Sequence, residues 1–222
     1  MEFNYQLKLS KRRKTVAIKV QPSGVSVYAP HTICKNWLNT WLLSKQQWVL
    51  DKQQSLDNTR QTDIWSSNTI MVYGREYELM QGMAESYIDH KQNKVHLKSN
   101  GLICKETANV ELKLLFSDAL TEYLLFKLPQ YCTKMNADFK TLKVRFYKRK
   151  WGSLSSNGTI AFNCTLLGAP KWVIDYVIVH ELAHYHVMAH NQTFWSIVSC
   201  HYPDFKDAKI YLKKYGEILT TW

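Results

Sequence analysis

Apolar and polar residues alternate along the first part of this 222-residue chain in the manner of short β-strands. Residues 16–20 read Val-Ala-Ile-Lys-Val and residues 25–28 read Val-Ser-Val-Tyr, and Pro22-Ser23-Gly24 between them predicts a hairpin. From about residue 33 to residue 56 the apolar positions recur every three or four residues, which predicts a helix. Four more short strands are expected at 69–73, 75–79, 86–89 and 94–98.

The second part of the chain predicts longer helices around a small sheet. A long apolar helix is expected from about residue 109 to residue 133, and Pro129 marks a place where it could end. In residues 151–163, Asn157-Gly158 between two alternating runs is a strong hairpin signal. A strand at 142–147 and helices at 171–188, 193–200 and 204–219 complete the pattern. We therefore expect an α+β protein with a β-rich region over residues 1–105 and a second domain over residues 106–222.

The composition is that of a soluble globular protein, with 45% hydrophobic residues and a net charge of +11. Stretches of basic residues lie at 11–14, at 140–150 and among the C-terminal lysines 206, 209, 213 and 214. Such stretches can bind DNA or another polyanion, although they equally suit solvated faces of a basic protein. No recognition helix, zinc finger or RNA-binding motif accompanies them.

Neither the membrane nor the secretory pathway is indicated. The chain has no run of 18 apolar residues, which excludes a transmembrane helix, and no signal-peptide core follows its first residues. The five cysteines are scattered and form no Cys-x-x-Cys pair. They are typical of reduced thiols in a cytoplasmic protein.

Residues 180–184 read His-Glu-Leu-Ala-His, and this motif carries most of the functional information. On an α-helix, residues four apart return to within about 40° of each other, so His180 and His184 project from one face and can hold one zinc ion. Glu181 lies beside them, close enough to act on a metal-bound water without being a ligand. The opposite side of this helix is expected to bury Ile174, Ile178, Leu182 and Tyr185.

A catalytic zinc keeps three protein ligands, and His190 is the leading candidate for the third. The chain has to turn before His190, because an unbroken helix would place it about 9 Å further along the axis. Metzincins use this spacing with a glycine midway, where this chain has Val187, and that weakens the metzincin interpretation. Asn191 could help to end the helix. The competing third ligands are His186 and His201.

Strands followed by a helix with the His-Glu-x-x-His motif are the zincin layout. In that layout, a sheet edge beside the helix can bind the substrate as an added strand. The hairpin at 151–163 is the nearest candidate for this edge. The hypothesis fails if the hairpin proves to lie far from His180.

Several motifs together resemble the YgjP-like metallopeptidases, which are compact zincins similar to the SprT and WLM proteases. The resemblance spans most of the chain. The matching residues are Arg12-Arg13-Lys14-Thr15, Tyr73-Gly74-Arg75, Arg149-Lys150-Trp151-Gly152-Ser153, Asn157-Gly158, Asn163, the run 177–184, His190 and Phe194-Trp195.

This resemblance implies zinc ligands His180, His184 and His190, with Glu181 as the catalytic base. It also implies a β-rich N-terminal part packed on a minimal zincin domain. One departure is Leu154, where the family usually carries a cysteine after Trp-Gly-Ser.

The favoured hypothesis is hydrolysis of peptide bonds in a polypeptide substrate by a zinc-activated water, with Glu181 as general base. The alternatives are a basic nucleic-acid-associated module with structural zinc, a protease that acts on DNA-bound proteins, and a hydrolase of another amide. A second donor to the oxyanion is usual in such a mechanism. The candidates for it are Arg145, Tyr147, Asn163 and Tyr202.

Overall fold

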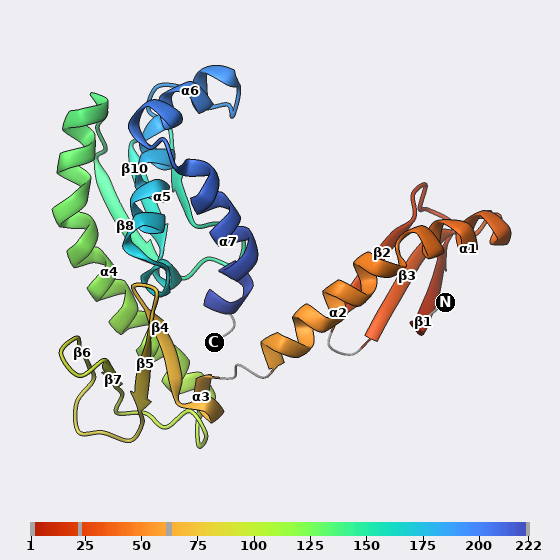
Figure 1. The fold of residues 1–222 in the computed structure, drawn as a ribbon, viewed down its shortest axis with the longest axis horizontal. Helices are drawn as coiled ribbons and strands as arrows, with labels where there is room; N and C mark the ends of the chain where they lie inside the picture. Colours follow the sequence, from red (N-terminus) through yellow and green to blue (C-terminus); the bar gives the residue numbers. More distant parts are fainter. Residues whose placement is uncertain (1–2, 22–23, 61–63, 221–222) are drawn as a thin grey trace. The chain divides into compact units, whose positions relative to one another are not determined.

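The computed structural model describes residues 3–21, 24–60 and 64–220 and divides the chain into two compact units, Met1–Thr62 and Asp63–Trp222. Within the described residues the chain forms three small sheets, seven α-helices and one 3₁₀ helix (Figure 1). The fold is therefore of the α+β class, as predicted. The predicted boundary between residues 105 and 106 stays a prediction. Among the described helices, none has the length and apolar character that a membrane-spanning segment needs.

The first unit contains a three-stranded sheet and two helices. The strands are β1 (Tyr5–Ser10), β2 (Ala17–Gln21) and β3 (Gly24–Pro30), in the order β1-β3-β2. Strands β2 and β3 pair antiparallel, which confirms the predicted hairpin, although residues 22 and 23 of its turn lie outside the described residues. Val25, Val27 and Ala29 are buried at every second position of β3, as the alternation requires.

The single helix predicted over residues 33–56 was wrong, because the structure has α1 (Lys35–Ser44) and α2 (Gln46–Arg60) instead. The break lies at Lys45, whose ψ is 0° and whose N–H donates to the Leu42 carbonyl at 3.1 Å. The Ser44 hydroxyl donates to the Trp41 carbonyl at 2.7 Å and so satisfies another carbonyl at the end of α1. Apolar periodicity continues across the break, so it does not reveal this local competition.

The second unit begins with α3 (Ile64–Ser67) and a four-stranded sheet. Its strands are β4 (Thr69–Val72), β5 (Arg75–Met80), β6 (Tyr87–Asp89) and β7 (Lys94–His96), in the order β4-β5-β7-β6. All four predicted strands are confirmed, with ends that differ by at most two residues. A turn at Tyr73 and Gly74, which both have positive φ, joins β4 to β5.

Helix α4 (Lys105–Met135) connects this sheet to the rest of the unit. Its buried positions recur every four residues; they are Ala108, Leu112, Phe116, Leu120, Leu124 and Leu128. Each step of four residues rotates the stripe by about 40°, so it turns by about 200° from the first position to the last. The N-terminal half of α4 can therefore face the four-stranded sheet while its C-terminal half faces the elements that follow.

The expectation that this helix could end near Pro129 was wrong, because α4 continues to Met135. Proline removes one helical hydrogen bond, and the carbonyl that loses its donor belongs to Leu125. The Leu125 side chain is 60% exposed, which places this gap on the water side of the helix. Leu124 and Leu128 on the other side are fully buried and hold the helix in place.

The remaining elements form the part that carries the His-Glu-x-x-His motif. Strands β8 (Thr141–Arg145), β9 (Gly152–Leu154) and β10 (Thr159–Asn163) make a sheet in the order β8-β10-β9. The 3₁₀ helix η1 (Cys164–Gly168) leads into α5 (Lys171–Ala183), which is followed by α6 (Gln192–His201) and α7 (Phe205–Leu219). Strand β10 pairs parallel with β8 and antiparallel with β9, so the predicted hairpin at 151–163 is confirmed and β9 is an edge strand.

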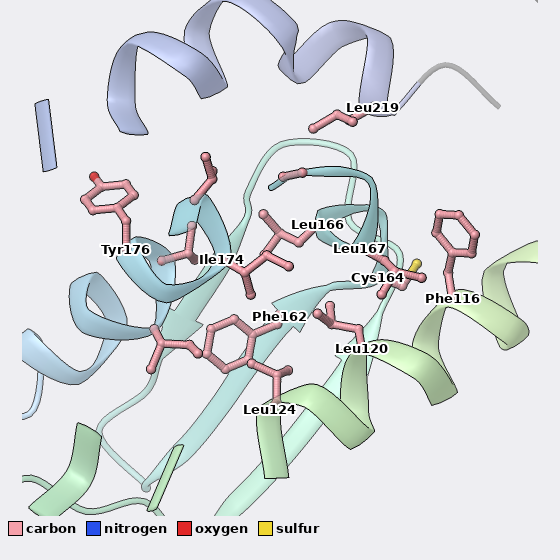
Figure 2. Close-up of a cluster of buried hydrophobic side chains, with 14 of the residues drawn as sticks. Phe116, Leu120, Leu124, Phe162, Cys164, Leu166, Leu167, Ile174, Tyr176 and Leu219 are labelled. Carbon is pink, nitrogen blue, oxygen red and sulfur yellow. The ribbon is translucent and has the colours of Figure 1, made fainter. Parts of the chain in front are cut away.

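Helices α4 and α5 pack against each other, α4 beside β8 and α5 beside β9. Figure 2 shows how Leu120 and Leu124 of α4 point toward Phe162 of β10, with Ile174 of α5 on the other side of that ring. These four side chains are all fully buried. This contact fixes α5 against the sheet and thereby positions the motif.

Glu111 joins α4 to two loops of the four-stranded sheet. Its carboxylate accepts hydrogen bonds from the Ser86 hydroxyl and from the backbone N–H groups of Lys98 and Ser99, the latter two at 2.9 Å. Burial by itself would raise the pKa of Glu111, but these hydrogen bonds outweigh it and lower the pKa to about 2. The ionised carboxylate is therefore the form that stabilises the fold.

We predict that Glu111→Gln lowers the free energy of unfolding at neutral pH by about 1–2 kcal/mol. Because the folded pKa lies below the unfolded value of 4.5, the difference between wild type and variant is complete above that value and shrinks as the pH falls toward 2. Urea unfolding over this pH range measures it, with Asp118→Asn on the same helix as the matched control. A difference that stays constant with pH would contradict this role of Glu111.

Candidate active site

Helix α5 carries His180 and Glu181, and His184 follows as its C-terminal cap. Ile174, Ile178 and Leu182 are fully buried on the opposite side, as predicted. Tyr185 was expected in the same stripe, and this was wrong: it is 54% exposed. The helix ends at Ala183, so the helical projection does not extend to Tyr185.

A tightened last turn ends α5 without glycine or proline. The N–H groups of His184, Tyr185 and His186 each donate to the carbonyl three residues earlier, at 3.0–3.1 Å. Such 3₁₀-type bonds are a common way to satisfy the last carbonyls of a helix. Val187 is not among the residues with positive φ, so the position where metzincins have glycine places no demand for glycine here.

Two side chains hold the turn that follows. The Nε2 atom of His186 lies 2.9 Å from the carbonyl of Met135, the last residue of α4, which gives this histidine a structural partner away from the candidate metal ligands. Asn191 was expected to help end the helix; instead it begins α6, since its Oδ1 accepts from the Phe194 N–H at 3.0 Å. The segment between His184, the C-cap of α5, and Asn191, the N-cap of α6, brings His190 back toward α5.

The imidazoles of His180, His184 and His190 converge. Among the described residues they form the group that could hold a metal ion, with one nitrogen from each within 4.8 Å of the others. The Nε2 atoms of His180 and His190 are 3.1 Å apart. Two nitrogens at about 2.0–2.1 Å from a tetrahedral zinc would lie about 3.3 Å apart, so the donor set fits this ion. His201, the other competing ligand, ends α6 and is not part of the group.

The Nδ1 atoms of His180 and His184 have partners of their own. The Nδ1 atom of His184 lies 3.2 Å from the Val187 carbonyl, which can only accept, so Nδ1 carries the proton and Nε2 is left free to bind a metal. The Nδ1 atom of His180 lies 3.4 Å from the Tyr176 hydroxyl. Phe194 packs against all three imidazoles, with ring centroids 4.6–4.9 Å away, and restricts their rotation.

The environment keeps His180 and His184 neutral. Burial, followed by the neighbouring His184, His190 and Lys209, lowers the pKa of His180 to about 3. Burial also lowers the pKa of His184, partly opposed by the hydrogen bond to Val187. A neutral imidazole is the form that binds a metal, so both side chains are ready to bind one at neutral pH.

Glu181 is 5% exposed and lies against β9. The Leu154 N–H donates a hydrogen bond to its carboxylate, and burial raises its pKa to about 8 against the opposing effects of this bond and of Lys150. A Cβ atom on Gly152 would lie 2.7 Å from both Cγ and Oε1 of Glu181. Glycine is therefore required at this position for the strand to approach the carboxylate so closely.

These contacts place the β9 edge beside the motif, as the hypothesis of an added substrate strand requires. A pocket of about 350 Å³ that includes His180 and Glu181 lies at Gly152, the start of β9. Another of about 300 Å³ that includes His184 lies at Leu154, its end. Leu154 contributes its backbone N–H to Glu181, a contact that does not depend on which side chain replaces the family's cysteine.

Two candidates for the second oxyanion donor have other partners. Asn163 is buried and uses its side chain to bind the carbonyls of Tyr147 and Lys150 and the N–H of Thr165. The Tyr202 hydroxyl donates to the Trp172 carbonyl at 2.6 Å. Sequence reasoning missed the contact of Gly152 with Glu181, which only the folded chain creates. It also missed the contact of Tyr176 with His180, although the same four-residue spacing on α5 could have revealed it.

A comparison with protein families identifies the family of this chain. The family model described as the YgjP-like metallopeptidase domain matches residues 14–215, which confirms the resemblance seen in the sequence. No curated protein matches. The metallopeptidase zymogen abylysin of Pyrococcus abyssi is 22% identical, with 40% of this chain and 93% of that chain covered at a TM-score of 0.37. The metallopeptidase zymogen jannalysin of Methanocaldococcus jannaschii is 19% identical, with 40% of this chain and 95% of that chain covered at a TM-score of 0.35. Likenesses of this size carry no conclusion about this chain.

We predict that His190→Ala lowers the affinity for zinc by at least about tenfold, because it removes one of three converging nitrogens. Elemental mass spectrometry after dialysis against zinc buffers measures the metal content of wild type and variant. His201→Ala is the matched control and is expected to keep the wild-type metal content. Full zinc affinity without His190 would move the third ligand to another residue.

Proposed function

Because the chain belongs to the YgjP-like metallopeptidase family, we propose that it is a zinc-dependent peptidase with His180, His184 and His190 as ligands and Glu181 as general base. The observation that carries this proposal is the convergence of three imidazoles beside a buried carboxylate. A bound zinc ion would supply a Lewis acid that polarises a substrate carbonyl and makes water acidic enough to lose a proton near neutral pH.

Glu181 would move that proton. Its carboxylate is held by the Leu154 N–H and by close contact with β9, so it cannot swing away from the histidines. A buried carboxylate with a raised pKa has a high affinity for a proton, which suits a group that takes one from water and delivers it to the leaving amine. A divalent cation beside it would lower this pKa again and keep the resting carboxylate ionised.

A polypeptide is the substrate that the surroundings of the site suit best. The edge strand β9 can pair with an extended chain, and the pockets at its two ends can accept side chains on either side of the cleaved bond. A small amide would use neither the strand edge nor both pockets. This argument favours peptide hydrolysis over hydrolysis of another amide.

The alternative of a nucleic-acid-associated module with structural zinc has less support. Structural zinc sites are closed by four protein ligands, whereas the described residues bring three ligand atoms together next to a pocket. A buried carboxylate without a cationic partner at contact distance would also be costly in a purely structural site. Both features are those of a site that has to admit a substrate.

We predict that Glu181→Gln keeps the wild-type zinc content and lowers kcat/KM for peptide hydrolysis by about a hundredfold or more. The amide retains the shape of the side chain but cannot accept the proton. Cleavage of a quenched fluorescent casein or peptide pool, with metal analysis of the same samples, measures both properties. Substantial turnover in the variant would remove Glu181 from the proposed role.

We also predict that Gly152→Ala lowers peptidase activity by at least about tenfold while zinc binding persists, since the new methyl group has to displace the Glu181 side chain. Gly168→Ala is the control: it also replaces a glycine in the second unit, and its new methyl group meets a side chain just as closely, that of Leu219 at 2.8 Å, but not Glu181. Equal loss of activity in both variants would point to a general loss of stability, which thermal unfolding detects.

A further inference from the structure

A groove lined by basic side chains leads away from the candidate active site. It consists of two adjoining pockets of about 350 Å³ and about 250 Å³, which share Lys150, Trp151 and Leu212. The first pocket includes His180 and Glu181 of the site together with Lys209. The second continues past Trp151 and adds Lys148, Arg149 and Lys213. We call this pair of pockets the basic groove.

The charges of the basic groove are almost all of one sign. Five cationic side chains line it, and the one acidic residue that lines it is Glu181 itself. Among the described side chains, ion pairs join Lys94 to Glu78 and Lys127 to Asp175, and no carboxylate pairs with Lys150 or Lys209. Their positive charge is therefore available to a ligand in the groove.

The two lysines nearest the site are held in place by weak contacts. The Nζ atom of Lys150 donates to the Ser153 hydroxyl at 2.8 Å and lies 4.4 Å from the centre of the Tyr147 ring. The Nζ atom of Lys209 lies 4.1 Å from the centre of the Trp195 ring. Lys150 acts electrostatically on Glu181 and Lys209 on His180, so both charges reach the atoms of the site.

The pocket on the other side of the site differs in charge. It is lined by one acidic and one basic side chain, Asp138 and Lys140, together with the apolar side chains of Phe139, Leu154 and Met188. A chain that crosses the site along β9 would thus meet a strongly positive field on one side of the cleaved bond and a nearly neutral surface on the other.

We propose that the basic groove binds an acidic segment of the polypeptide substrate, so that the protein selects peptides with carboxylates on one side of the cleaved bond. This inference rests on the proposed function. The apolar walls of Trp151, Val177 and Leu212 accept the backbone and the aliphatic stems, while the ammonium groups meet the carboxylates. The groove opens directly onto the candidate catalytic residues, which favours a peptide over a nucleic acid as its occupant.

The test compares peptides that carry an apolar run next to a run of glutamates with otherwise identical peptides that carry glutamines. The wild type is expected to cleave the glutamate peptides with a kcat/KM about tenfold higher. Placing the glutamates before or after the apolar run identifies the side concerned. C-terminally amidated and free peptides distinguish side-chain carboxylates from a terminal carboxylate.

Two double variants with the same loss of charge on α7 locate the effect. Lys209→Gln with Lys213→Gln removes two cations of the groove and is expected to reduce the preference for glutamate to about threefold or less. Lys206→Gln with Lys214→Gln removes two exposed lysines of the same helix that do not line the groove, and is expected to keep the preference. Because the readout is a ratio of two substrates, a general loss of activity does not affect it.

Binding of labelled peptides to the Glu181→Gln variant, measured by fluorescence polarisation, separates this inference from the proposed function. Tighter binding of the glutamate peptides supports the inference about the basic groove even if no peptide is cleaved. The absence of cleavage would count only against the proposed peptidase function. Equal cleavage and equal binding of the glutamate and glutamine peptides would overturn the inference and leave the peptidase intact. If the glutamate and glutamine peptides are cleaved and bound equally while a single-stranded oligonucleotide binds tightly, the groove is assigned to nucleic acid, and this result too would overturn the inference.

Discussion

Helix α5 ends at Ala183, and the candidate site depends on how it ends there. Bonds to the carbonyl three residues earlier close the last turn, and the Val187 carbonyl that this turn presents lies against His184. The same short turn allows the chain to reverse and bring His190 to 3.1 Å from His180. A longer helix would carry His190 away from the pair, and the third nitrogen would be lost.

The elements around this turn are rigid for separate physical reasons. His186 contacts the carbonyl of Met135, so the turn after α5 is fixed to the C-terminal end of α4. Further along α4, the Tyr123 hydroxyl donates to Asp175 of α5 at 2.7 Å. Glu111, near the other end of α4, binds the loops of the four-stranded sheet. One long helix thus links the turn after α5 to the four-stranded sheet.

Burial changes the proton affinities of the side chains in the candidate site, and it also carries a desolvation cost. It keeps His180 neutral and raises the proton affinity of Glu181, and both effects disfavour charged groups that water would otherwise stabilise. The Leu154 N–H offsets part of this cost at Glu181, and the absence of a side chain on Gly152 makes room for the contact. Strand β9 is therefore both the backbone partner of the Glu181 carboxylate and an edge strand of its sheet.

The sequence by itself determined the features that depend on neighbours along the chain. The four-residue spacing placed His180 and His184 on one face, and alternation with Asn157-Gly158 located the hairpin that contains β9. Prediction from the sequence failed where local rules compete or where packing overrides them, as at Lys45, Pro129 and Asn191. Only the tertiary structure decided the approach of Gly152 to Glu181 and the groove that Lys150 and Lys209 share, because these contacts join residues about 30 and 60 positions apart, whose distance no local pattern encodes.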